Sequence, residues 1–175
     1  MRQMSKARNR KTTPHAPGRL PQGFTLIELM IVLLVVFILL LLALPSYQGQ
    51  AVRQQVKESL ALVEPIKNIE TQSYRLLGAF PVDNLSAGIP ASDKYVGLYV
   101  RDVLIENGAI HITFGNRIHK NAQGKILTLR PAIVLKEPMV PIAWICGNAS
   151  IPEGMTAVGE NRTDLPGTSL PVECR

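Results

Sequence analysis

The feature that most constrains the fold of this chain is an unbroken apolar segment near its N-terminus. Residues 29–44 are sixteen consecutive apolar residues, and the wider segment 24–44 is interrupted only by Thr25 and Glu28. As an α-helix, the 21 residues of the wider segment span about 32 Å, close to the hydrocarbon thickness of a bilayer. The segment is therefore predicted to be a transmembrane helix with one carboxylate near its start.

Two ordinary explanations account for only part of this pattern. A cleaved secretory signal has a shorter apolar core and a small-residue cleavage site, whereas this core ends Leu-Ala-Leu-Pro at residues 42–45. A plain membrane anchor explains the length but not the Gly-Phe-Thr-Leu-Ile-Glu entry at residues 23–28. A charge at the centre of a bilayer costs roughly 3 kcal/mol, so the carboxylate of Glu28 requires a reason.

The positive charge of the chain is concentrated before the apolar segment. The 175 residues carry a formal net charge of +6, and residues 1–23 contain six basic residues and no acidic one. Beyond residue 23, thirteen basic residues balance thirteen acidic ones. Basic residues that flank a membrane segment stay on the cytoplasmic side, so the excess is interpreted as a topology signal. The remainder of the chain is expected to face outward.

Residues 23–28, Gly-Phe-Thr-Leu-Ile-Glu, resemble the processing motif of type IV prepilins. The resemblance implies that a dedicated prepilin peptidase cuts after Gly23 and that Phe24, the new N-terminus, is N-methylated. It also implies that Glu28 pairs with the N-terminal amine of a neighbouring subunit and sets register during assembly. A buried carboxylate is tolerable when it meets a cation, which makes this role physically reasonable. The alternative for Glu28 is a carboxylate at headgroup level with no further role.

The rest of the chain is divided by its composition and by this resemblance. The predicted parts are a cleaved basic leader at 1–23, a transmembrane and filament-core helix at 24–45, an amphipathic helix at 46–77, a connecting loop at 78–94, an antiparallel sheet at 95–146 and a disulfide-bounded C-terminal region at 147–175.

Two prolines modify the helical part of this plan. Apolar residues recur every three or four positions from Val52 to Ile69, which indicates a helix with one face on a core. Pro45 is expected to kink the helix at the junction, as in pilins. Pro65 is expected to kink the helix or divide it near residue 64.

The second half of the chain is predicted to form a sheet. Asn-Gly at residues 107–108 lies between apolar runs, which predicts a type I′ hairpin that opposes Ile105 with Ile110. Further strands are expected at 125–130 and 142–146. The fold class is α+β: a long N-terminal helix, its apolar half projecting and its amphipathic half packed on a four-stranded antiparallel sheet, with a disulfide-closed C-terminal loop.

Two cysteines, Cys146 and Cys174, both lie on the outward side of the apolar segment. An even number of cysteines in an oxidising compartment predicts one disulfide, with two free or buried thiols as the alternative. The closed loop of about 29 residues would contribute roughly 3–4 kcal/mol. Trp144-x-Cys146-Gly147 and the ending Cys-Arg resemble the disulfide-bound C-terminal region of type IVa pilins.

The sequence contains no convergent catalytic or metal-binding set. His111 and His119 are the only histidines after the leader, and spacing places no third metal ligand beside them. No P-loop, dinucleotide fingerprint or nucleophile elbow is present. Arg117, Lys120 and Lys125 with His119 form a small basic patch, read as a solvated turn with a DNA-contacting surface as the sharper alternative. No enzymatic activity, metal or cofactor is expected.

The function predicted from the sequence is that of a structural subunit of a type IV pilus. The chain would be a single-pass protein of the inner membrane before assembly and part of an extracellular pilus afterwards. Its expected partners are further copies of itself, prepilin peptidase and the pilus assembly machinery, with weak contact to DNA or a host surface left open. The resemblance implies roles in adhesion, twitching motility and DNA uptake.

Three alternatives stay open. Residues 37–42 are bulky where many major pilins carry Gly and Ala, which leaves a minor pilin possible. A type II secretion pseudopilin shares the leader motif but typically lacks the disulfide loop. An uncut, membrane-anchored adhesin or DNA receptor belongs to a different class, and it would retain its leader and would not self-assemble.

Overall fold

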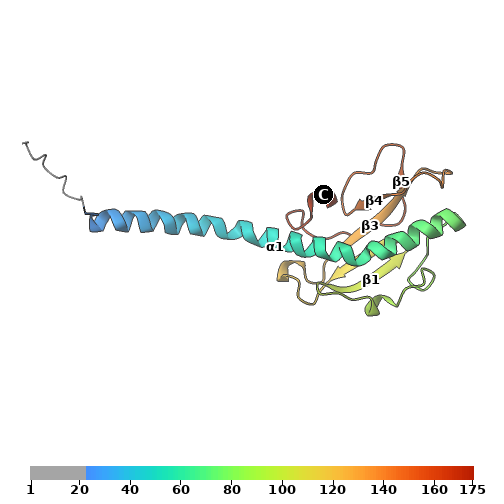
Figure 1. Ribbon diagram of the computed structural model, residues 1–175, viewed down its shortest axis with the longest axis horizontal. Helices are drawn as coiled ribbons and strands as arrows, with labels where there is room; N and C mark the ends of the chain where they lie inside the picture. The colour runs from blue at the N-terminus through green and yellow to red at the C-terminus, as the bar shows by residue number, and fades with distance from the viewer. Residues whose placement is uncertain (1–22) are drawn as a thin grey trace, which may run out of the picture. The chain divides into compact units, whose positions relative to one another are not determined.

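A computed structural model describes residues 23–175, except for the side chains of residues 43–48. All of the predicted leader except Gly23 therefore lies outside the described residues. Helix α1 (Leu26–Leu77) leads into the sheet, and a boundary between two compact units falls at Leu41/Leu42. The strands are β1 (Val100–Glu106), β2 (Ala109–Phe114), β3 (Ile126–Ile133), β4 (Ala143–Cys146) and β5 (Thr156–Ala157), with short 3₁₀ helices η1 (Ser92–Lys94), η2 (Lys120–Ala122) and η3 (Val172–Cys174) (Figure 1).

Helix α1 is continuous through both of its prolines. Of the two outcomes predicted for Pro65, a kink or a division, the division is wrong, and a kink at Pro65 stays a prediction. The Pro65 ring is exposed to solvent, whereas Val63 and Ile66 beside it are fully buried in the core. Proline removes one backbone hydrogen bond from the helix, and the packing of its buried neighbours offsets that loss. A kink at Pro45 stays a prediction.

The sheet is antiparallel with the strand order β1-β2-β3-β4, which confirms the predicted α+β class. The hairpin prediction is also confirmed: Ile105 pairs with Ile110, and Asn107 and Gly108 have φ angles of 50° and 81°. Positive φ at both central residues is what a type I′ turn requires. The two-residue strand β5 adds to β3, a pairing that the sequence did not predict.

One face of the sheet packs on the amphipathic part of α1 (Figure 1). The period of 3.6 residues in the helix and of two residues in the strands directs apolar side chains into the same layer. Fully burying each large aliphatic side chain contributes about 1.5–3 kcal/mol. The centre of this core contains Val52, Val56, Val63 and Ile66 of α1 and Val103, Ile105, Ile110, Ile112, Phe114, Leu127 and Leu129 of the strands.

The C-terminal region is attached to the sheet by a disulfide and by backbone hydrogen bonds. Cys146 and Cys174 form the predicted disulfide, and both residues belong to the hydrophobic core. The Val158 N–H donates to the Pro131 carbonyl at 2.8 Å, and the Asp164 N–H donates to the Ile126 carbonyl at 3.1 Å. A turn-rich segment with little regular structure is thereby held against β3.

The connection between α1 and β1 is held by the buried side chain of Asn84. Its amide nitrogen donates to the carbonyls of Pro90 and Val103 at 3.0 and 2.9 Å. Its oxygen accepts from the Ile105 N–H at 2.7 Å. Asn84 thus satisfies backbone groups of β1, the first strand of the sheet order, which a further strand would otherwise pair.

The contacts of Asn84 predict a stability effect. Asn84→Ala leaves two buried backbone groups of β1, the Val103 carbonyl and the Ile105 N–H, without their partner, and each unsatisfied group costs about 1–3 kcal/mol. We expect the variant to lose more than about 2 kcal/mol of unfolding free energy in urea titrations. Asn121→Ala is the matched control, because the Asn121 side chain is exposed. Equal midpoints for both variants would contradict the assigned role of Asn84.

The disulfide predicts a second stability effect. Replacing both Cys146 and Cys174 with Ala releases a loop of about 29 residues, which lowers the unfolding free energy by about 3–4 kcal/mol on the loop-entropy model. The urea midpoint of the double variant should match that of the wild-type chain under reducing conditions. An unchanged midpoint in both measurements would show that the bond does not stabilise the domain.

Candidate processing and assembly site

The start of α1 is fixed by a capping residue within the predicted processing motif. The Glu28 N–H donates to Thr25 Oγ1 at 3.3 Å, and the Leu29 N–H donates to the Thr25 carbonyl at 3.2 Å. Thr25 and Glu28 have the Thr-x-x-Glu spacing of a capping box, in which the first side chain satisfies a free N–H of the first turn. The helix therefore begins at Leu26, directly after the cap.

This cap leaves the Gly23–Phe24 bond outside the helix. Gly23, Phe24 and Thr25 have no helical or strand assignment, and all three residues are exposed. A protease needs an accessible bond that is not held in helical hydrogen bonds, and such bonds concentrate at chain segments next to regular elements. The bond that the motif predicts to be cut has both properties.

Glu28 lies in the first turn of α1, four residues after Phe24. Its side chain is exposed, and within residues 23–175 it forms no ion pair. Carboxylates are favoured at the N-terminus of a helix, where the free N–H groups carry partial positive charge. The structure thus presents a carboxylate beside the position of the expected new amine.

The apolar part of α1 is exposed on every side. Between Phe24 and Leu42, seventeen large apolar side chains are exposed, with exposed fractions from 46% at Val36 to 81% at Phe24. A helix that is apolar all round is normally buried, and exposed apolar surface of this extent marks an interaction site.

Among the described residues, no helix has the combination of length and apolar character that identifies a membrane-spanning segment.

The second face of the sheet carries a charged cluster that the sequence analysis missed. Arg162 Nη1 forms an ion pair with Glu106, and Arg162 Nε donates to Glu160 at 3.0 Å. The hydrogen bond from Arg162 lowers the pKa of Glu106. The backbone N–H of Arg162 also donates to Thr128 Oγ1 at 3.0 Å. Sequence spacing gives no signal for this cluster, since its members come from β1, β3 and the C-terminal region.

His111 lies on the same face and is a buried structural residue in this fold. Its exposed fraction is 3%, and its Nδ1 lies 3.0 Å from Thr128 Oγ1. Burial lowers the pKa of His111, and the positive charge of Arg162 adds to this effect. Within the part of the chain that the structure describes, no group of three or more potential ligands is placed to hold a metal ion.

The predicted basic patch is partly neutralised by the fold. At the start of η2, Nδ1 of His119 accepts a hydrogen bond from the backbone N–H of Asn121. The backbone N–H of His119 donates to Gln55 Oε1 at 3.0 Å. Lys125 forms an ion pair with Asp164 at 3.1 Å. Only Arg117 and Lys120 of the four are exposed. A surface for polyanions gains no support from this arrangement.

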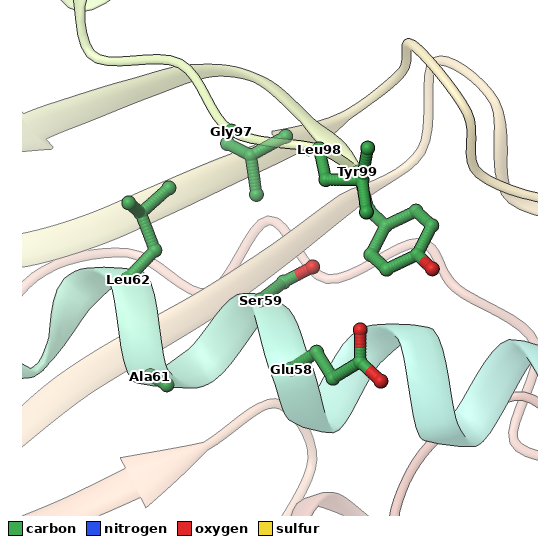
Figure 2. A pocket seen from close by; sticks show the side chains of 8 residues that line it. Glu58, Ser59, Ala61, Leu62, Gly97, Leu98 and Tyr99 are labelled. Atoms are coloured by element: carbon green, nitrogen blue, oxygen red, sulfur yellow. The ribbon is translucent and has the colours of Figure 1, made fainter.

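A cavity of about 400 Å³ lies between α1 and the segment that leads into β1. Figure 2 shows the Leu62 and Leu98 side chains at this cavity, with the carboxylate of Glu58 and the ring of Tyr99 at its side. The Ser59 hydroxyl donates to the Gln55 carbonyl at 2.8 Å, and no histidine lines the cavity. Its lining therefore offers no activated nucleophile.

Comparison with known protein families gives a match for both the apolar and the globular part of the chain. A family described as the prokaryotic N-terminal methylation motif matches residues 19–44, and a family described as pilin, a bacterial filament protein, matches residues 52–175. These two ranges include the processing motif and the whole sheet.

The similar proteins include pilins and fimbrial proteins of two Neisseria species. The type IV major pilin protein PilE of Neisseria gonorrhoeae is 42% identical over 73% of this chain and 75% of its own length. A type IV major pilin protein PilE1 of the same species is 38% identical over 89% of this chain and 88% of its own. A fimbrial protein of Neisseria meningitidis serogroup B is 34% identical over 89% and 95%. With its methylation motif, its helix-on-sheet fold and its C-terminal disulfide, this chain belongs to the pilin family.

Proposed function

We propose that this chain is a structural subunit of a type IV pilus and that it assembles through the exposed apolar part of α1. The observation that carries the proposal is the apolar surface between Phe24 and Leu42, on a chain that matches the pilin family over residues 52–175. The relatives named as major pilins favour a filament subunit over a pseudopilin or an uncut receptor. Adhesion, twitching motility and DNA uptake stay predictions from the family.

Processing comes first in this proposal. A prepilin peptidase cuts the exposed Gly23–Phe24 bond, and Phe24 is then N-methylated. Before the cut, the apolar segment anchors the precursor in the inner membrane, and the globular domain faces outward. The match of residues 19–44 to the methylation-motif family supports both steps. The Thr25 cap supports them too, because the scissile bond needs no unwinding of α1.

The cohesion of the filament depends on whether its subunits would otherwise be surrounded by lipid or by water. In a bilayer, lipid covers the apolar side chains as well as another helix does, so packing of helices gains no hydrophobic energy there. Outside the cell, separating two subunits exposes those side chains to water at about 1.5–3 kcal/mol each. Association costs about 4–15 kcal/mol, which a dozen such side chains exceed. The free-energy change for transfer of a subunit from the membrane to the filament is therefore close to zero. Release of a subunit from the filament into water is strongly unfavourable.

Glu28 supplies the register in this mechanism. The apolar side chains of neighbouring helices pack nearly as well after a slip of one turn, because packing of aliphatic side chains is not directional. A carboxylate inside an apolar layer is tolerated only where it meets a cation, and the amine of Phe24 of a neighbouring subunit is that cation. One charge pair then selects a single axial position.

The role of Glu28 is tested by Glu28→Gln, which keeps the Thr25 cap but removes the charge. We expect the leader to be cut as before and the amount of sheared filament to fall at least tenfold. Leader removal is read by intact mass of the membrane fraction, and filaments are quantified after shearing. Glu58→Gln removes an exposed carboxylate elsewhere on α1 and should assemble normally. Wild-type filament levels for Glu28→Gln would exclude the charge pair as the source of register.

A further inference from the structure

A carboxyl group is buried between α1 and the sheet without a partner. Glu70 has an exposed fraction of 0%, and among the described residues neither of its carboxyl oxygens accepts or donates a hydrogen bond. Nearly all buried polar groups in proteins are hydrogen-bonded, so an exception of this kind calls for a physical explanation. Processing and assembly, as proposed above, make no use of this residue.

The neighbours of Glu70 on its own helix do not supply a cation. Glu70 lies four residues from Ile66 and four from Tyr74, both buried on the same face of α1. The Lys67 amine lies 2.9 Å from Glu64 Oε2 and 5.7 Å from the centre of the Trp144 ring. Lys67 is thus already engaged at the edge of the helix–sheet interface. The exposed Arg75 lies in the last turn.

The sheet does not supply a cation either. Its side chains toward α1 are apolar, among them Ile105, Ile110 and Leu129. The charged and titratable residues of the strands next to these positions face the opposite side, because successive strand residues alternate between faces. Those residues are Asp102, Glu106, His111 and Arg130, while Arg101 is exposed and pairs with Asp102.

We propose that Glu70 makes the packing of α1 on the sheet sensitive to pH. The apolar interface accommodates the neutral carboxyl and excludes the carboxylate. The globular domain is therefore more stable against unfolding in mild acid, and its stability falls as the pH rises toward neutrality. This device acts within one subunit and holds whether or not the leader is removed.

The pH window follows from the two states of the carboxyl. Burial raises the pKa of Glu70 from 4.5 to about 8 in the folded chain. Well below pH 4.5, the carboxyl is protonated in both states and the full stability is present. As the pH rises from 4.5 to about 8, only the unfolded chain ionises, so stability falls. Above about pH 8 the folded carboxyl ionises too, and the loss levels off.

The expected size of the effect is large. Between pH 5.5 and 7.5, the unfolding equilibrium constant should rise about 70-fold through Glu70 alone. Other groups add their own pH dependence, so the effect is measured as a difference between chains. Glu70→Leu removes the titrating group and keeps a similar volume, and its stability should lack this 70-fold component. The variant should also be more stable than wild type at pH 7.5, because an unpaired polar group leaves the core.

The test uses the full-length chain in a nonionic detergent, with urea unfolding followed by fluorescence of Trp144, the single tryptophan. Trp144 reports on the same interface, since Lys67 lies over its ring. Unfolding is measured at half-unit steps from pH 5 to 9 for wild type and Glu70→Leu. The exposed-carboxylate variant Glu58→Gln is the control and should keep the wild-type profile.

A second measurement keeps the test decisive if Glu70→Leu does not fold. The infrared spectrum of the folded wild-type chain at pH 6.5 should contain a protonated carboxyl band that Glu70→Gln lacks. A carboxyl that is ionised at pH 6.5 would overturn the proposal. Parallel pH profiles for wild type and Glu70→Leu would overturn it as well.

Discussion

The exposed apolar surface of α1 is the constraint on which the rest of the molecule depends. Seventeen large apolar side chains between Phe24 and Leu42 are exposed. Water is an unfavourable environment for such a surface, so lipid or other copies of the chain must cover it. In the proposed mechanism, the subunit exchanges a cover of lipid for a cover of other subunits, and the predicted cleavage site and Glu28 serve that exchange.

The same helix continues into a second environment with different rules. From Val52 to Ile69 the apolar side chains of α1 lie mainly on one face, and that face is buried on the sheet. The disulfide then attaches the C-terminal region to β4, and the hydrogen bonds of Asn84 attach the connecting loop to β1. Glu70 is an exception to this apolar packing, because it places an unpaired carboxyl in the interface between α1 and the sheet.

Sequence reasoning succeeded where local chemistry determines structure. The Asn107-Gly108 turn, the antiparallel sheet and the disulfide follow from turn preference, alternation and cysteine count, and the structure confirms them. The division of the helix that it allowed at Pro65 does not occur, because packing of the adjacent residues offsets the lost hydrogen bond. Sequence reasoning also missed the Arg162 cluster and the burial of Glu70, since both depend on which residues distant in the chain meet in the fold.

The measurement that tests the account most directly is the intact mass and N-terminal sequence of the protein isolated from its native host. The account predicts a chain that begins at N-methylated Phe24, lacks residues 1–23 and is two hydrogens lighter for the Cys146–Cys174 disulfide. A mature chain that still carries residues 1–23 would contradict it, because an uncut N-terminus leaves Glu28 without its amine partner and the apolar helix without a route into a filament.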